Sequence, residues 1–358
     1  MIKFSTIKIY KFPILLIIFA LIKKTDLNMT IKDLKEVADI INKVIDATPN
    51  LKGKISVQHE DFSYEDGTGK LIYWREDRTE QGNSVELKLN ANDKFKSYFE
   101  EVAPSRKFDY GQFYHMLKFD YAIKTLQNKE IQISALSYLW ENDPAEQTEF
   151  LRRHGFLKNI VDDKIEEIKN KVFIFCFSDS FRSEEAWKLY GQNEIGVALA
   201  FRFVEFDQNY TDLYQLKDVV YDSGYDFDFI NEIQFRLKKK FGRQLLFSGL
   251  SNLSKFYKRS KYAWERETRL CFDYQANEDY AEFYKKLGMT FPDEINLEKF
   301  FQIQYDNTLD RYFIKVPFCN KLFKLKVSEI ICGKNITNEQ IEQLKSLVSP
   351  DTIIWRRQ

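Results

Sequence analysis

The sequence predicts an α+β fold in which mixed sheets are flanked by helices, together with a small α+β extension on the amino-terminal side. Segments such as KVFIFCFS and IGVALAFRF are short, continuous apolar runs, which are typical of buried strands. Other segments carry apolar residues at helical spacing, and the two kinds alternate along the chain without an internal repeat.

Composition limits the classes of protein that the chain can represent. Its 358 residues are 44% hydrophobic and 30% charged, enough for a packed core and two compact domains. The 54 basic and 54 acidic residues cancel, so an anion site must come from local clustering of charge. Four well-separated cysteines favour neither a zinc site nor a disulfide framework. We therefore expect a cytoplasmic protein with free thiols, and no membrane partner.

The first 28 residues differ from the rest of the chain. They have a basic start and an apolar run over residues 12–22, which is too short to span a bilayer and lacks a small-residue cleavage site. A signal peptide, an apolar anchor and an over-extended translation start remain as interpretations. We prefer the third, with translation beginning at Met29, and treat residues 1–28 as a leader.

Residues 29–105 are predicted to form the small α+β extension. Apolar residues follow a helical stripe from Thr30 to about Asp46. The strand-like segments KISVQHEDFSYE and KLIYWRED are joined by DGTG, which is typical of a hairpin turn. A strand at VELKLN and a helix at DKFKSYFEEV complete the extension, and residues 106–358 form the second domain.

The second domain supplies the main sheets. We predict its strands at residues 113–119, 171–178, 195–203, 268–274, 312–318 and 324–332. Helices are expected over DYAIKTLQN and NEQIEQLKSLV. In ENDPAEQ, Asp143 fits a helix N-cap and Pro144 the first helical position, so the turn at Asn142 is predicted to be chiefly structural.

The segment KYAWERETRL, residues 261–270, carries three charges at alternate positions: Glu265, Glu267 and Arg269. In a strand all three point to one face, with consecutive side chains ~6.6 Å apart. The carboxylates can then share a substrate hydroxyl or raise one another's pKa, while Arg269 stabilises the charge. The alternative is a surface row of ion pairs, each worth at most ~1 kcal/mol. We expect the row to face a cleft shared with His115.

A local excess of positive charge precedes this row. Nine basic residues and no acid lie between residues 233 and 264: Arg236, Lys238, Lys239, Lys240, Arg243, Lys255, Lys258, Arg259 and Lys261. The segment predicts an anion site for a nucleotide or other phosphate-bearing ligand, with Lys258, Arg259 and Lys261 as binding residues. A nucleic acid is the alternative partner, and a solvated helix face is the structural alternative.

Several motifs together resemble a bacterial family known as domain of unknown function 2971. The resemblance runs from about Phe113 to about Leu344 through FYHMLKFDYAIKTLQNKEIQISALSYLWENDPAE, FIFCFSDSFRSEEAWKLYGQNEIGVALAF, the charged row and SEIICGKNIT. The matching positions are Asn142, Asp143, Pro144, Cys176, Phe177, Ser178, Trp187, Tyr190, Gly196, Val197, Glu265, Glu267, Arg269 and Gly333. Trp264 and Thr268 depart from the Tyr and Trp of the family's Tyr-Glu-x-Glu-Trp-Arg pattern. The resemblance implies a fold family, and the activity has to be inferred from the site.

A more distant resemblance, to ADP-ribosyltransferases, implies NAD as the cofactor. Those proteins bind NAD in a cleft between two small sheets. The resemblance implies that His115 holds the ribose and that Tyr138 or Tyr190 stacks on nicotinamide. It also implies that Glu267 stabilises the oxocarbenium-like transition state while Glu265 orients the acceptor. The chain departs from the pattern because it has no Ser-Thr-Ser on the second strand.

The sequence therefore predicts a transferase acting on NAD, in defence or stress, without a metal ion. One alternative is a nucleic-acid-binding or nuclease-like protein, in which Asp143, Glu265 and Glu267 gather on a metal, although no E-x-K follows the acid. Another is a non-catalytic interaction module. The sequence contains no P-loop, GxSxG or HExxH motif, so three classes of enzyme are excluded: P-loop ATPases, α/β-hydrolases and zincins. No oligomeric state is predicted.

Overall fold

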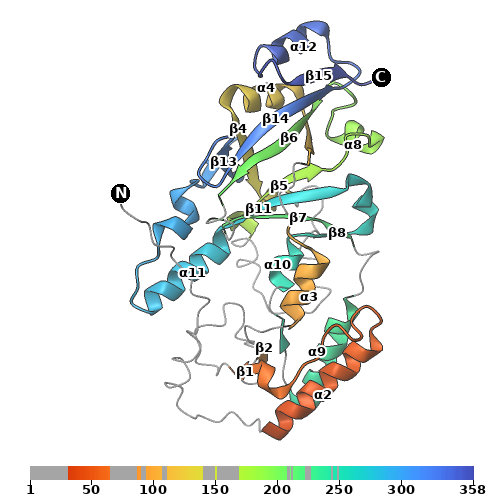
Figure 1. The fold of residues 1–358 in the computed structure, drawn as a ribbon, viewed down its shortest axis with the longest axis vertical. Helices are drawn as coiled ribbons and strands as arrows, with labels where there is room; N and C mark the ends of the chain where they lie inside the picture. The colour runs from red at the N-terminus through yellow and green to blue at the C-terminus, as the bar shows by residue number, and fades with distance from the viewer. Residues whose placement is uncertain are drawn as a thin grey trace, which may run out of the picture.

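A computed structural model describes residues 31–64, 87–89, 94–106, 111–139, 150, 169–207, 210, 213–221, 227–242, 245–247 and 250–358. The leader, residues 1–28, and the predicted turn at 142–144 lie outside these ranges. The fold is α+β, as predicted. The large sheet occupies one end of an elongated molecule, and the N-terminal helix α2 lies at the opposite end beside α9 (Figure 1).

The helices are α2 (Ile31–Ala47), η1 (His59–Asp61), α3 (Lys94–Val102), α4 (Phe119–Asn128), α5 (Leu136–Leu139), α8 (Glu184–Leu189), α9 (Asp228–Phe241), α10 (Leu250–Ser254), η3 (Ser260–Glu265), α11 (Tyr274–Lys286), η4 (Asp293–Ile295), η5 (Leu297–Lys299) and α12 (Asn338–Lys345). The strands are β1 (Phe62–Tyr64), β2 (Leu87–Leu89), β3 (Phe113–Leu117), β4 (Glu130–Ala135), β5 (Val172–Ser178), β6 (Val197–Phe206), β7 (Gln215–Asp218), β8 (Val220–Tyr221), β9 (Leu245–Leu246), β10 (Tyr257–Lys258), β11 (Glu267–Asp273), β12 (Gln304–Asp306), β13 (Arg311–Pro317), β14 (Phe323–Cys332) and β15 (Ile353–Arg356).

The large sheet has ten strands. Eight of them follow the order β12-β13-β4-β5-β3-β6-β14-β15, while β11 pairs with β5 and β7 pairs with β11. All six strands predicted for the second domain are confirmed within a few residues, as β3, β5, β6, β11, β13 and β14. The continuous apolar runs of β5 and of the first half of β6 are explained by burial on both faces.

The two faces of β5 and β11 belong to two different cores. On one face Phe175 of β5 and Leu270 of β11 pack with α4 and α12, through side chains such as Leu126 and Leu344. On the other face Ile174 packs with the N-terminal part of the chain. This separation follows from strand alternation, and it decides which side chains can meet at the site.

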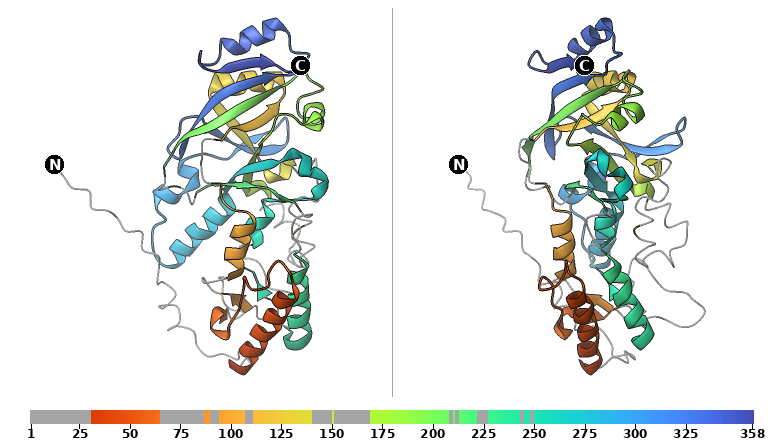
Figure 2. Two further views of the ribbon diagram at one scale, coloured as in Figure 1. Left: turned by 45° about the vertical axis from the view of Figure 1, so that its right-hand side comes forward. Right: turned by 90° about the vertical axis from the view of Figure 1, so that its right-hand side faces the viewer.

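Residues from both sides of position 105 build the second of these cores. Phe95 of α3 stacks on Phe229 of α9 at 5.9 Å, and Phe247 meets Phe95 edge-on at 5.0 Å. Helix α2 lies against α9, and β2 pairs in parallel with β9. Figure 2 shows these helices below the sheet in two further views. The domain boundary near residue 105 stays a prediction, and the core continues across it.

Several local predictions need correction. The strand expected over KISVQHEDFSYE is short: η1 occupies residues 59–61, so His59 is not in a strand, and β1 covers Phe62–Tyr64. The helix face considered for the basic segment, residues 233–264, is interrupted, because Gly242 ends α9 with a φ of 64° and β9, α10 and β10 follow. Strand β7 and helix α11 were not predicted.

The four cysteines are free thiols, as predicted: Cys176, Cys271, Cys319 and Cys332. Within the described part of the chain, no helix combines the length and apolar character needed to cross a bilayer.

Candidate functional site

A sharp corner in the chain separates Glu265 from Glu267. Glu265 is the last residue of η3, Arg266 adopts a left-handed φ of 48°, and β11 begins at Glu267. The expectation that Glu265, Glu267 and Arg269 share one strand is therefore wrong for Glu265, whereas the strand predicted at residues 268–274 is confirmed as β11. The reason is that β5 ends at Ser178, the partner of Glu267, so earlier residues have no strand with which to pair.

The corner brings both carboxylates onto one ammonium group. Nζ of Lys258 donates to Oε2 of Glu265 at 2.5 Å and to Oε2 of Glu267 at 3.1 Å. Lys258 lies in β10, which pairs in parallel with β8. All three residues are buried, with exposed fractions of 9%, 8% and 5%. The prediction that the two glutamates face away from bulk water is confirmed.

Arg269 completes a group that we call the charged cluster: Lys258, Glu265, Glu267 and Arg269. Arg269 is fully buried. Its Nε donates to Oε1 of Glu267 at 2.8 Å, and one terminal nitrogen donates to Oε2 of Glu267 at 3.3 Å. The other terminal nitrogen donates to the carbonyl oxygen of Lys255 at 2.7 Å. Two cations thus balance two carboxylates, as buried charges require.

Burial and mutual repulsion shape the electrostatics of the cluster. Burial, together with the Glu267 carboxylate, raises the pKa of Glu265 above its ordinary value. Burial alone would lower the pKa of Lys258, but Glu267 and Glu265 together raise it. Lys258 therefore stays protonated, while Glu265 takes up a proton more readily than an ordinary glutamate does.

The partly exposed side of the cluster is formed by two aromatic residues. The hydroxyl of Tyr190 donates to Oε1 of Glu265 at 2.9 Å, and burial raises the pKa of Tyr190. The ring of Tyr190 stacks on Trp264 at 6.4 Å and an interplanar angle of 27°. Tyr190 is 44% exposed, so this pair connects Glu265 with the surface.

Backbone hydrogen bonds fix the position of the two glutamates. The hydroxyl of Ser178 donates to the carbonyl oxygen of Glu265 at 2.7 Å. The backbone N–H of Glu267 donates to the hydroxyl of Tyr221 at 3.0 Å. Tyr221 belongs to no recognisable motif and was not predicted from the sequence. Ser178 stands in the Cys-Phe-Ser motif of the family resemblance, which was the available signal.

Three predicted phosphate-binding residues meet around one aromatic ring. The cationic groups of Lys258, Arg259 and Lys261 lie 4.8, 5.7 and 4.6 Å from the centre of the Tyr262 ring. Lys261 is exposed and Arg259 partly exposed. This arrangement gives a local positive surface directly beside Glu265.

Other cations of the predicted basic segment are held elsewhere by acids. The ion pairs are Arg236 with Glu232, Lys240 with Glu36 and Lys255 with Asp273. Arg243 lies outside the described residues. The segment is therefore not one continuous basic surface, because the chain breaks after α9 and carries its two halves to different places.

The expected cleft shared by His115 and the glutamates is wrong. His115 lies on β3 as predicted, but its ring stacks on Phe175 at 4.2 Å. Its Nδ1 donates to the carbonyl oxygen of Cys176 at 2.8 Å. In the β5–β11 register Arg269 is the partner of Cys176, so Phe175 lies on the opposite face of the sheet. Burial lowers the pKa of His115 to about 4.

Tyr138, the other candidate for stacking, also lies away from the cluster. It belongs to the short helix α5, and its ring is covered by the guanidinium group of Arg311 at 4.4 Å. Of the two tyrosines considered from the sequence, Tyr190 is the one that contacts a glutamate. Among the described residues, no group of three or more His, Cys, Asp or Glu side chains is arranged to hold a metal ion.

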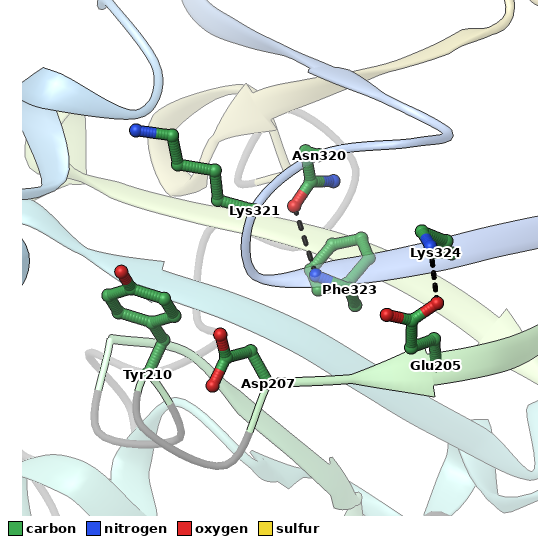
Figure 3. Close-up of a pocket in the computed structure, with 7 residues that line it drawn as sticks. All are labelled: Glu205, Asp207, Tyr210, Asn320, Lys321, Phe323 and Lys324. Atoms are coloured by element: carbon green, nitrogen blue, oxygen red, sulfur yellow. Dashed lines mark hydrogen bonds and ion pairs between the residues drawn. The ribbon is translucent and has the colours of Figure 1, made fainter. Parts of the chain in front are cut away.

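A shallow surface hollow of about 260 Å³ lies where β6 ends and β14 begins (Figure 3). Its lining residues are Glu205, Asp207, Tyr210, Asn320, Lys321, Phe323 and Lys324. Glu205 and Lys324, which are cross-strand partners, form an ion pair at its edge, and Oδ1 of Asn320 accepts from the backbone N–H of Phe323 at 3.1 Å. The hollow contains no member of the charged cluster, and we assign it no role.

Residues 186–270 match the model of a family described as Protein of unknown function (DUF2971). This confirms the predicted family resemblance over a stretch shorter than the one predicted. The matched stretch contains Tyr190, Trp264 and the whole charged cluster, and it excludes His115 and Tyr138. No curated protein and no solved structure matched the chain.

Proposed function

We propose that this chain, whose matched family segment contains the charged cluster, is an NAD-using enzyme that transfers ADP-ribose, with Glu265 at the reacting centre. The observation that carries the proposal is the placement of Glu265. It is a buried carboxylate with a raised pKa, beside a partly exposed aromatic pair and a group of cations. Carboxylates whose pKa is perturbed by burial and by a neighbouring charge occur often at functional sites.

Glu265 suits the chemistry of NAD cleavage. The bond between C1′ of the ribose and the nicotinamide nitrogen breaks, and its electron pair leaves with neutral nicotinamide. Positive charge develops on the ribose, and a carboxylate in a water-poor site stabilises it strongly. An acceptor oxygen or nitrogen then bonds to C1′ and loses its proton. Oε2 of Glu265 accepts from Lys258 and Oε1 accepts from Tyr190, and each oxygen retains acceptor capacity.

The surroundings of Glu265 suit a dinucleotide. Tyr190 and Trp264 offer aromatic faces on which a nicotinamide or adenine ring can stack. Arg259 and Lys261 lie beside Tyr262 and provide cations for the two phosphates. NAD carries both kinds of group, which is why we propose it before other phosphate-bearing ligands.

The geometry favours different roles for the two glutamates from those implied by the distant resemblance. Both oxygens of Glu267 accept from Arg269, and Oε2 also accepts from Lys258. Glu267 is therefore a positioning group that holds the ammonium group of Lys258 against the carboxylate of Glu265. In this proposal Glu265 acts on the ribose, and His115 takes no part because it faces the other core.

The direct test is to incubate the purified protein with NAD and measure free nicotinamide by chromatography. We expect release above the rate without protein, and ADP-ribose on the protein itself or in solution when water is the acceptor. Release that requires a separate protein acceptor is tested by adding a cell extract and probing for ADP-ribosylated proteins. Absence of nicotinamide in both assays overturns the proposal.

The cations around Tyr262 also favour a second candidate, the binding of single-stranded nucleic acid. The ring of Tyr262, flanked by the partly exposed Arg259 and the exposed Lys261, offers both stacking and phosphate neutralisation. An oligonucleotide that binds with strong salt dependence, while NAD does not bind, would favour this candidate over the first.

A further inference from the structure

We propose that Arg357 is a positioning residue that holds a strained turn at Gln192–Glu194 and, through it, keeps the hydroxyl of Tyr190 on Glu265. The effect on turnover rests on the proposed function, whereas the positioning itself does not. In the sequence, Arg357 lies 92 or more residues from Glu265, Tyr190 and the turn. In the folded chain it contacts the turn directly.

The turn is strained because three consecutive residues other than glycine adopt left-handed backbone conformations. The φ angles are 48° at Gln192, 53° at Asn193 and 71° at Glu194. Residues other than glycine rarely adopt this conformation, because their Cβ atom then lies too close to the following carbonyl oxygen. A turn of this kind persists when the surrounding structure holds it in place.

The end of β14 holds one side of the turn. The backbone N–H of Gly333 donates to Gly196 at 3.0 Å, and that of Asn335 donates to the carbonyl oxygen of Glu194 at 2.9 Å. A Cβ atom at Gly333 would lie 2.3 Å from the same oxygen of Glu194, so only glycine allows this approach. The backbone of the turn is thereby fixed to the sheet.

Arg357 holds the other side with its guanidinium group. One terminal nitrogen pairs with Glu194 in the turn, and the other pairs with Glu184 at the start of α8. The guanidinium carbon lies 5.4 Å from the centre of the Trp187 ring, and the arginine side chain is 12% exposed. A planar fork that bridges two carboxylates suits arginine and not lysine. Figures 1 and 2 show α8 beside the end of the chain.

We call the bridge from Arg357 to Glu184 and Glu194 the clamp. The short helix α8 connects the clamp with Tyr190. Tyr190 is the C-cap of this helix, and its backbone N–H donates to Ala186 at 2.8 Å. Gly191, the next residue, packs so closely on Trp187 that a Cβ atom would lie 2.5 Å from that ring. Helix α8 and the turn therefore move as one unit. When the ion pairs of Arg357 are lost, this unit is free to shift, and the hydroxyl of Tyr190 then moves away from Glu265.

The hydrogen bond from Tyr190 has a measurable effect on Glu265. Burial and the Glu267 carboxylate raise the pKa of Glu265, while Lys258 and the Tyr190 hydroxyl lower it. Cys176 is a further titratable group near this carboxyl. Loss of the tyrosine hydrogen bond removes a group that stabilises the carboxylate, so the pKa of Glu265 should rise further.

The test is a carboxyl titration of protein labelled with ¹³C at the glutamate side chains, in which Glu265→Gln identifies the Glu265 signal. We expect Tyr190→Phe and Arg357→Gln each to raise the Glu265 midpoint, and the double variant to raise it no further than Tyr190→Phe alone. Arg356→Gln is the matched control, because Arg356 is exposed and donates to Asn338 at 2.8 Å. An unchanged midpoint in Arg357→Gln overturns the proposal.

Further variants separate positioning from stability and from the proposed activity. Arg357→Lys keeps the charge without the fork, and we expect an intermediate midpoint. If Arg357→Gln does not fold, Glu184→Gln and Glu194→Gln each remove one carboxylate of the clamp, and unchanged midpoints in both contradict it. A shifted midpoint in a protein that releases no nicotinamide supports the clamp and refutes the proposed function. A slower release in Arg357→Gln with an unchanged midpoint refutes the clamp alone.

Discussion

Glu265 and Glu267 accept hydrogen bonds from the same Lys258 ammonium group, at 2.5 and 3.1 Å, although only Glu267 lies in a strand. The two carboxylates differ in their other partners. Glu267 accepts a hydrogen bond from the fully buried Arg269, whereas Glu265 accepts one from Tyr190, whose side chain is partly exposed. This asymmetry gives the two glutamates different expected responses to the same substitution.

Glu267→Gln should destabilise the protein far more than Glu265→Gln does. Without the Glu267 carboxylate, Arg269 is left as a buried charge, which costs about 3–5 kcal/mol. In Glu265→Gln, Lys258 still pairs with Glu267, so we expect a loss of about 1 kcal/mol. Urea denaturation of the two variants measures the difference. Equal losses would contradict the asymmetry of the cluster.

Asp273 allows a cap and an ion pair to be separated. Its Oδ1 accepts from the backbone N–H of Ala276 at the start of α11, and its Oδ2 pairs with the buried Lys255. Asp273→Asn keeps the cap and loses the ion pair, so we expect a loss of about 3 kcal/mol. Asp273→Ala should cost about 1 kcal/mol more because the cap is lost as well. Identical unfolding free energies in the two variants would refute the contribution of the cap.

His115 should make the protein sensitive to acid. Its pKa is lowered by burial from 6.5 to about 4, so between these values the unfolded chain binds more protons than the folded one. Stability from this group is therefore present above pH 6.5 and is lost as pH falls towards 4, by at most about 3 kcal/mol.

The measurement is the unfolding free energy of His115→Gln and of the parent protein across this pH range. We expect the substitution to reduce the slope of the unfolding free energy against pH. A parent-like slope in His115→Gln would show that His115 has the same pKa in the folded and the unfolded protein, and would contradict this prediction.

Arg259 and Lys261 should contribute to binding of a phosphate-bearing ligand through charge. Both lie beside Tyr262 and are at least partly exposed, so Arg259→Gln and Lys261→Gln should weaken nucleotide binding and make it less sensitive to salt. Lys286→Gln is a control, because that lysine pairs with Glu282 on α11. Titration calorimetry at low and high salt tests this, and binding with unchanged salt dependence in both variants would contradict it.

Much of the fold could be predicted from the sequence because the central strands are unambiguous. Continuous apolar runs such as the one ending at Ser178 have to be buried on both faces, and the structure places β5 inside the sheet. Helix α12 was predictable for a local reason as well. Thr337 and Gln340 form a capping box, in which Gln340 N–H donates to the Thr337 hydroxyl at 3.2 Å.

The site was predictable only in part, because pairing between distant strands decides it. The sequence shows Glu265, Glu267 and Arg269 at alternate positions, but not that β5 ends opposite Glu267. The chain therefore turns at Arg266, and Glu265 approaches Lys258 from a 3₁₀ helix. Local pattern shows which residues are charged, and the register between strands determines which of them meet.

The prediction that His115 shares a cleft with the glutamates was wrong for a related reason. Its position on a strand was predicted correctly, but the face on which it lies depends on β3 pairing with both β5 and β6. In that arrangement its ring meets Phe175 instead of Glu267. Arg357 was not considered from the sequence, because only the fold brings it to Glu194.

The most direct test of the central claim is the rate of nicotinamide release from NAD by the parent protein, Glu265→Gln and Glu282→Gln, with NAD affinity measured in parallel. Glu265→Gln should slow release on the order of 100-fold while NAD affinity changes little, because the carboxylate acts mainly in the transition state. Glu282→Gln alters an exposed ion pair on α11 and should match the parent. Release at the parental rate by a folded Glu265→Gln protein would contradict the assignment of Glu265 to the reacting centre.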